Sequence, residues 1–150
     1  FILQKINQEP KERHIHAGFQ VYVDGRVQDF SESKYMSLIV CEKEVDQAKK
    51  TRRQIQIEKA HLHDNVGDVV HSEREGAVWR DLFKNLNFKI DQAKSSDGYV
   101  NGKKVANIFA YPINAYDSTV IFIGRSDKKL LKNSVTRKRI REVEKEGIEC

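Results

Sequence analysis

The sequence has no long hydrophobic run. No segment approaches the roughly 20 consecutive apolar residues that a membrane-spanning helix needs, and 33% of the 150 residues are charged against 39% hydrophobic. A chain of this length is typical of a single domain with a buried core. A starting methionine is also lacking, and the chain opens on the apolar Phe1-Ile2-Leu3. We interpret residues 1–13 as a stub or linker, which predicts a preceding signal peptide or anchor helix.

Cysteine is scarce, and its two positions are Cys41 and the final residue, Cys150. In an extracytoplasmic protein they could form a disulfide that closes a loop of about 110 residues and contributes several kcal/mol to stability. Two unrelated thiols fit the sequence equally well. The pairing therefore stays open.

Aromatic residues are missing from the basic segments. The net charge is +5, and the excess is concentrated in two stretches, which contain Lys49, Lys50, Arg52 and Arg53, and Lys128, Lys129, Lys132, Arg137, Lys138, Arg139 and Arg141. Such runs can contact nucleic acid or an anionic surface. Acidic residues are interleaved with the second stretch, however, and no aromatic ring among the basic residues can stack on bases. We therefore expect solvated helix faces and no nucleic-acid partner.

Motifs for catalysis are absent as well. The chain has no recognisable nucleophile motif, no glycine-rich phosphate loop and no convincing pair of acid and base carboxylates. Ser31, Ser33, Lys34 and Ser37 lie close together in the sequence, but in no known arrangement. These absences favour a binding role over an enzymatic one.

What the chain does have is a set of paired histidines. His14 and His16 form one His-x-His pair, His61 and His63 form a second, and the fifth histidine is His71. Side chains of a β-strand alternate between its faces, so residues two apart point the same way. Each pair therefore offers two imidazoles on one surface, and neutral imidazole is the commonest protein ligand for zinc, copper and nickel.

The first pair lies on a predicted strand. Apolar residues alternate with other residues over 15–23, which indicates a half-buried strand. Asp24-Gly25 then predicts a two-residue hairpin turn, because both residue types tolerate a positive φ. His14 and His16 fall on the face opposite the core residues.

Residues 60–73 predict a second hairpin. A three-residue loop at 65–67, with Gly67 in the left-handed conformation, places Leu62 opposite Val70. Directly opposite residues share a face, so three histidines would lie together: His61, His63 and His71. A two-residue turn would instead place an apolar residue opposite a histidine. The register that gathers the histidines is also the one that pairs the core residues.

The remaining segments complete an α+β pattern. The charged segment 42–59 has few apolar residues and predicts an exposed loop or a loosely held helix. The apolar spacing over 77–86 predicts an amphipathic helix, in which Trp79 and Phe83 are core residues. Asn101-Gly102 predicts a hairpin turn.

The order of these segments predicts one α+β domain over residues 1–150. A ββαββ core, in which a helix crosses a mixed sheet, fits residues 60–124. The hairpin before it is then an N-terminal addition, and residues 127–147 form a C-terminal helical segment.

The second half of this core resembles ubiquitin-like β-grasp domains of the small sulfur-carrier type. The resemblance rests on Tyr99-Val100-Asn101-Gly102-Lys103-Lys104-Val105 and on the run from Tyr116 to Ile123. Those domains carry an N-G-x-x-V hairpin, a turn with an aspartate and a hydrophobic strand. Sulfur carriers end in Gly-Gly after that strand, whereas this chain continues into a charged helix. The resemblance therefore implies a β-grasp-like fold and not sulfur transfer.

Nearly the whole chain is similar to a group of uncharacterised bacterial and archaeal proteins. The similarity is carried by the segments around the two His-x-His pairs and by Trp79-Arg80-Asp81-Leu82-Phe83, and it is weak after Ile123. Those proteins are single domains outside the membrane behind an N-terminal anchor helix. The resemblance implies an extracytoplasmic location, periplasmic or at the cell surface, and it implies no activity.

We therefore expect a divalent transition metal, zinc or copper, bound by the clustered histidines. The candidate ligands are His61, His63, His71, His14, His16 and Asp64, of which Asp64 is either a ligand or an acceptor that orients an imidazole. The alternative is a structural or interaction module without a metal, in which a protein partner adds to an exposed sheet edge.

Overall fold

The computed structural model describes residues 10–37 and 50–147, so Cys41, Cys150 and the question of their pairing lie outside the described residues. The strands are β1 (Glu12–Val23), β2 (Arg26–Val27), β3 (Val69–Arg74), β4 (Ser96–Val100), β5 (Lys103–Val105) and β6 (Ser118–Ile123). The α-helices are α1 (Arg52–Lys59), α2 (Trp79–Asn85) and α3 (Arg137–Glu146), and the 3₁₀ helices are η1 (Ser33–Tyr35), η3 (Ile108–Ala110) and η4 (Lys128–Asn133).

The α+β class with a mixed sheet and a C-terminal helix is confirmed. None of the described helices has the length and apolar character to cross a bilayer.

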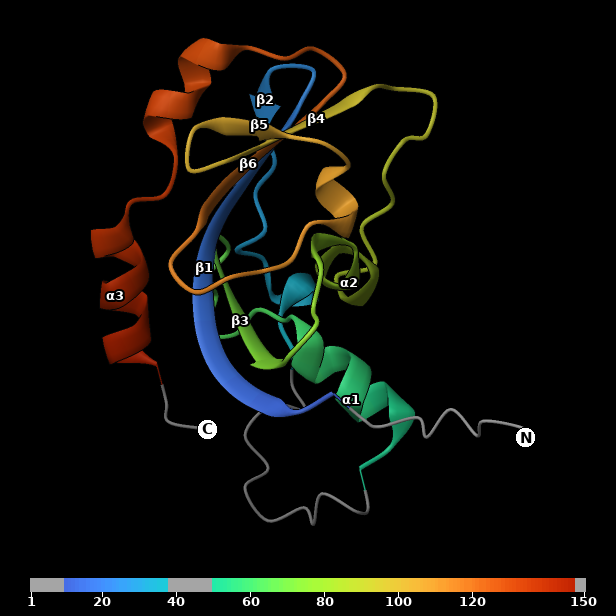
Figure 1. The fold of residues 1–150 in the computed structure, drawn as a ribbon, viewed down its shortest axis with the longest axis vertical. Coiled ribbons are helices and arrows are strands. Elements are labelled where there is room, and N and C mark those ends of the chain that lie inside the picture. The colour runs from blue at the N-terminus through green and yellow to red at the C-terminus, as the bar shows by residue number, and fades with distance from the viewer. Residues whose placement is uncertain (1–9, 38–49, 148–150) are drawn as a thin grey trace, which may run out of the picture.

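The sheet is built around β1, the long curved strand of Figure 1. The strand order is β2-β1-β6-β4-β5, and β3 pairs with β1 outside this order. β1 runs parallel to β6 and antiparallel to β2 and β3. One strand therefore connects the main sheet to the strand that carries His71.

The place of the N-terminal hairpin differs from the prediction. Residues 60–124 were expected to form the core, with the first hairpin as an addition. Instead β1 lies between β2 and β6, and β3 is the strand outside the main order. The alternating pattern predicted a strand with one buried face, whereas residues 16–22 of β1 are largely covered on both faces in the structure.

Both predicted two-residue turns are present. Asp24 and Gly25 have φ values of 49° and 83°, and β1 pairs with β2 directly across them. Asn101 and Gly102 have φ values of 51° and 80° and join β4 to β5. Positive φ at both central residues is typical of the hairpin turn that matches the twist of the strands.

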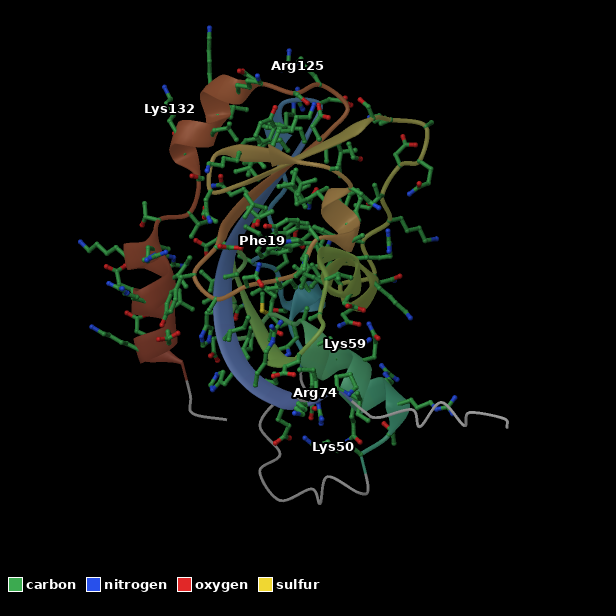
Figure 2. All side chains as sticks on the ribbon, viewed as in Figure 1. Phe19, Lys50, Lys59, Arg74, Arg125 and Lys132 are labelled. Atoms are coloured by element: carbon green, nitrogen blue, oxygen red, sulfur yellow. The ribbon has the colours of Figure 1, made fainter. Side chains whose placement is uncertain are left out.

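One face of the sheet packs against α2. Phe19 of β1 is 1% exposed and contacts Trp79 of α2 with ring centroids 5.7 Å apart. Figure 2 labels Phe19 within this packed interior. Leu82 and Phe83 of α2 are also buried, which confirms the predicted core face of the helix. Burial of each such side chain contributes about 1.5–3 kcal/mol relative to exposure.

The other face of the sheet is covered by the C-terminal segment, so that α2 and α3 lie on opposite sides of β1 (Figure 1). Val135, Ile140 and Val143 pack with Val69 of β3. Gly18 of β1 lies beneath this layer, where an added Cβ would come within 2.6 Å of Val135 Cβ. The face that carries both histidines is therefore buried at His16 and Gly18, whereas His14 is exposed.

The charged segment before the second histidine pair contains a helix. Residues 42–49 lie outside the described part of the chain, whereas Arg52–Lys59 forms α1. Thr51 and Gln54 form a capping box, in which each side chain accepts a hydrogen bond from the backbone N–H of the other residue. The helix alternative therefore holds for residues 52–59, and a loop over that range is wrong.

The hairpin predicted over residues 60–73 forms only in part. His61 and His71 exchange two backbone hydrogen bonds of 3.0 Å, as the predicted register requires. Leu62, however, pairs with Met36 through an isolated parallel bridge. The left-handed residues are Asp64 and Asn65 rather than Gly67. Asp and Asn tolerate this conformation, and Gly67 is instead needed because the backbone of Ser31 approaches it closely.

Candidate metal centre

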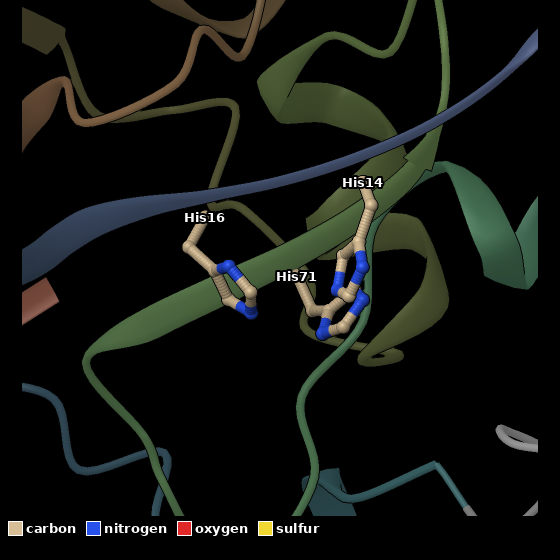
Figure 3. Close-up of side chains that lie close together, drawn as sticks. All are labelled: His14, His16 and His71. Carbon is tan, nitrogen blue, oxygen red and sulfur yellow. The ribbon is translucent and has the colours of Figure 1, made fainter. Parts of the chain in front are cut away.

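Three histidines from β1 and β3 form the first group, which we call the outer triad: His14, His16 and His71. His16 pairs directly with His71 in the antiparallel register, and His14 lies two residues before His16. One ligand nitrogen from each ring lies within 4.8 Å of the others. Figure 3 shows the three rings side by side on the same side of the two strands.

The inner triad comprises His61, His63 and His71, again with one ligand nitrogen of each ring within 4.8 Å of the others. His61 is placed by its bridge to His71. His63 follows two residues later, and its Nε2 lies 2.9 Å from Nδ1 of His71. The predicted gathering of the three histidines is confirmed.

His71 is the ring that the two triads share. The centroid of its ring lies 4.3 Å from that of His14 and 4.5 Å from that of His16. The corresponding distances to His61 and His63 are 4.9 and 5.0 Å. All five histidines of the protein therefore form one continuous cluster around His71.

The cluster spans the boundary between solvent and protein interior. His61 and His71 are 2% and 3% exposed, and His16 is 5% exposed. The side chain of His63 is 15% exposed, and His14 is exposed. The burial of three of the imidazoles argues against the view that these are ordinary surface histidines, because buried polar groups require partners.

Three of the rings are oriented by oxygen atoms at Nδ1. His61 Nδ1 donates to the carbonyl oxygen of Ile57 at 3.0 Å. His63 Nδ1 lies 2.6 Å from Asp64 Oδ2, and His16 Nδ1 lies 3.1 Å from Glu144 Oε2. These partners assign the proton to Nδ1 and leave the lone pair on Nε2. Metal-binding histidines commonly have one ring nitrogen held in this way.

Two buried ring nitrogens of the cluster have no hydrogen-bond partner among the described residues. They are Nε2 of His61 and Nε2 of His71, both buried. Glu73 Oε1 lies 3.5 Å from Nε2 of His71, which is too long for a good hydrogen bond. A buried nitrogen without a partner costs free energy, and a bound cation would supply the missing interaction.

The environment favours the neutral form of the buried rings. Desolvation lowers the pKa of His61 to about 3, with a smaller contribution from His71. Desolvation and then the neighbouring His16 and His14 lower the pKa of His71 to about 2. Desolvation also lowers the pKa of His16, although the hydrogen bond to Glu144 opposes the shift. Neutral imidazole is the form that ligates metals.

Helix α1 and strand β3 hold the inner triad. Arg74 at the end of β3 is 4% exposed, and its guanidinium bonds Glu58 of α1 at 2.6 Å. Lys50 also forms an ion pair with Glu58. Figure 2 places Arg74 and Lys50 at the end of the molecule where α1 and β3 lie. The anchored helix then presents the Ile57 carbonyl to His61.

Helix α3 orients His16 of the outer triad through Glu144. Glu144 accepts a hydrogen bond from Tyr116 Oη at 2.7 Å with one carboxylate oxygen and contacts His16 with the other. The guanidinium groups of Arg137 and Arg141 lie 5.9 and 5.7 Å from the Tyr116 ring centroid. Sequence reasoning missed Glu144 and Tyr116, because Glu144 lies 128 residues from His16 and no spacing rule connects them.

The structure brings together all six residues proposed from the sequence. The five histidines supply the possible ligand nitrogens, whereas Asp64 contacts Nδ1 of His63. Asp64 was predicted to be either a metal ligand or an acceptor that orients an imidazole, and this contact corresponds to the orienting role.

No family model, curated protein or solved structure matches this chain. The similarity to uncharacterised extracytoplasmic domains therefore stays a prediction, and the case for function rests on the histidine cluster.

Proposed function

We propose that this protein binds a divalent transition metal ion, zinc or copper, through its five-histidine cluster. One observation carries the proposal. The Nε2 atoms of His61 and His71 are buried without a partner, beside other imidazole nitrogens in both triads. Such an arrangement is unfavourable for a protein without a bound cation and favourable with one.

The dimensions of the triads support the proposal. Two nitrogens bound to one zinc ion at about 2.1 Å lie at most about 4.2 Å apart. The candidate nitrogens of each triad lie within 4.8 Å of one another, so small side-chain adjustments would suffice. The described part of the site supplies no thiolate, and imidazole ligands suit zinc and copper(II).

The test is metal titration of the full chain after chelator treatment, by isothermal titration calorimetry with Zn²⁺ and Cu²⁺. The variant His71→Gln removes the ring that both triads share while it keeps similar volume. Thr119→Val is the matched control, because Thr119 is a buried sheet residue whose hydroxyl also lacks a partner. We expect tight binding in the unmodified protein and the control, and a loss of affinity of about 10-fold or more in His71→Gln.

Weak binding of equal strength in all three proteins would refute the metal site. The interaction module would then be the better account. The end strands of the main order, β2 and β5, comprise two and three residues, and such short edges limit strand addition. The longer β3 pairs with β1 and, beyond it, only through the isolated His61–His71 bridge, so β3 is the edge that a partner strand would use.

We also propose an extracytoplasmic location behind an N-terminal anchor. The support is the sequence resemblance described above. Fractionation of the source cells tests it, and recovery of the protein from the cytosol alone would refute it.

A further inference from the structure

We infer that the two triads are alternative positions for one ion, which is captured at the outer triad and held at the inner triad. This inference rests on the proposed metal binding and adds to it an entry route and a stoichiometry. The observation behind it is the shared residue, since His71 belongs to both groups.

The stoichiometry follows from the chemistry of His71. A neutral imidazole has one lone pair and one N–H, so it can ligate a single ion. The two triads therefore compete for the same ring. Without His71 each triad keeps only two histidines, which is fewer than the three protein ligands typical of a zinc site with an open position. One ion per chain is the expected maximum.

The direction of movement follows from burial. The outer triad includes the exposed His14, so an ion in solvent first meets this triad at His14, whereas its other two rings, His16 and His71, are buried. The inner triad combines His61 and His71, which are at most 3% exposed, with the half-buried His63. An ion reaches the inner position by exchanging ligands around the common ring.

The hydrogen bonds assign different roles to the two positions. His61 and His63 are oriented at Nδ1 by groups close in sequence, the Ile57 carbonyl and Asp64. In the outer triad, His16 is oriented by Glu144 of α3, whose side chain is 38% exposed. The described contacts show no corresponding partner for His14. The inner triad is therefore the better organised, and we expect it to be the tighter position.

The experiment combines equilibrium and stopped-flow binding of Zn²⁺ to the chelator-stripped full chain. Two matched variants, His14→Gln and His61→Gln, each remove one imidazole from a different triad. We expect one Zn²⁺ per chain in the unmodified protein. His14→Gln should slow association about tenfold while affinity changes less than about threefold, because entry and exit use the same outer position. His61→Gln should keep fast association but lose affinity about tenfold or more, through faster dissociation.

Two results would overturn the inference and leave metal binding intact. One is the binding of two ions per chain, which would mean that the triads are filled together. The other is an equal loss of affinity in both variants with an unchanged association rate, which would indicate a single ion surrounded by the whole cluster. A complete lack of binding by the unmodified protein would refute the proposed function itself.

Discussion

The properties of each histidine depend on what its two ring nitrogens contact. His61 donates from Nδ1 to the Ile57 carbonyl, and its Nε2 is buried without a partner. Protonation would place a charge in a site that is 2% exposed, next to His71. The same features that make the ring a suitable ligand therefore make it resist protonation.

The metal-free protein should lose stability in acid. The pKa of His61 falls from an ordinary 6.5 to about 3 on folding. Between these values the unfolded state holds more protons than the folded state, so the free energy of unfolding decreases as the pH falls. For each such histidine the slope is at most about 1.4 kcal/mol per pH unit.

Urea unfolding at several pH values between 7 and 4, with chelator present, measures this slope. His61→Gln should show a shallower dependence than the unmodified protein, because glutamine does not titrate. Carboxylates contribute equally to both proteins, so the difference isolates His61. Identical slopes would contradict a neutral, buried His61.

At the scale of the elements, the contact between α3 and β1 determines how His16 of the outer triad is covered and oriented. Gly18 of β1 permits this contact, since an added Cβ would come within 2.6 Å of Val135 Cβ and 3.3 Å of Ile140 Cδ1. Glu144 on the same helix then reaches His16. The docking of one helix therefore links a packing residue to the orientation of a candidate ligand.

Gly18→Ala should destabilise the protein by about 1–3 kcal/mol, because the added methyl group overpacks Val135, just before α3, and Ile140 of α3. Gly147→Ala is the control at the end of the same helix. Gly147 has a φ of −63°, and its Cβ would approach no atom closer than 3.4 Å. This control should be neutral or stabilise by up to about 1 kcal/mol. Chemical denaturation measures both, and a neutral Gly18→Ala would show that α3 does not pack against β1 as described.

At the scale of the whole molecule, the cluster joins segments that are far apart in sequence. β1, β3 and the segment after α1 supply the five rings, and α3 contacts them through Glu144. A ligand that binds at this junction binds the folded state, because only folding brings these segments together. Metal binding should therefore be coupled to global stability.

Zn²⁺ should raise the melting temperature of the full chain, and excess chelator should reverse the rise. At a free concentration about 100-fold above the dissociation constant, binding stabilises the fold by about 2.7 kcal/mol. His71→Gln should show little response, whereas Thr119→Val should respond like the unmodified protein. An equal response of all variants would mean that zinc acts elsewhere on the chain.

The sequence alone was sufficient to predict the features that depend on neighbouring residues, such as turns and the buried faces of helices and strands. Asp24-Gly25 and Asn101-Gly102 identified their turns because few residue types tolerate positive φ at both positions. The apolar spacing of α2 identified its buried face, and the two-residue period placed His14 and His16 on one side of β1. The gathering of His61, His63 and His71 was also predicted, since it followed from one strand register.

Other features were determined only by tertiary structure. The join of the two histidine groups through His71 depends on the pairing of β1 with β3, and the sequence allowed this pairing without requiring it. The central place of β1 and the burial of its second face depend on α3, whose charged sequence resembles a solvated helix. Glu144 reaches His16 from 128 residues away. Local patterns follow from backbone sterics and periodicity, whereas such distant contacts depend on how whole elements pack, which no short segment encodes.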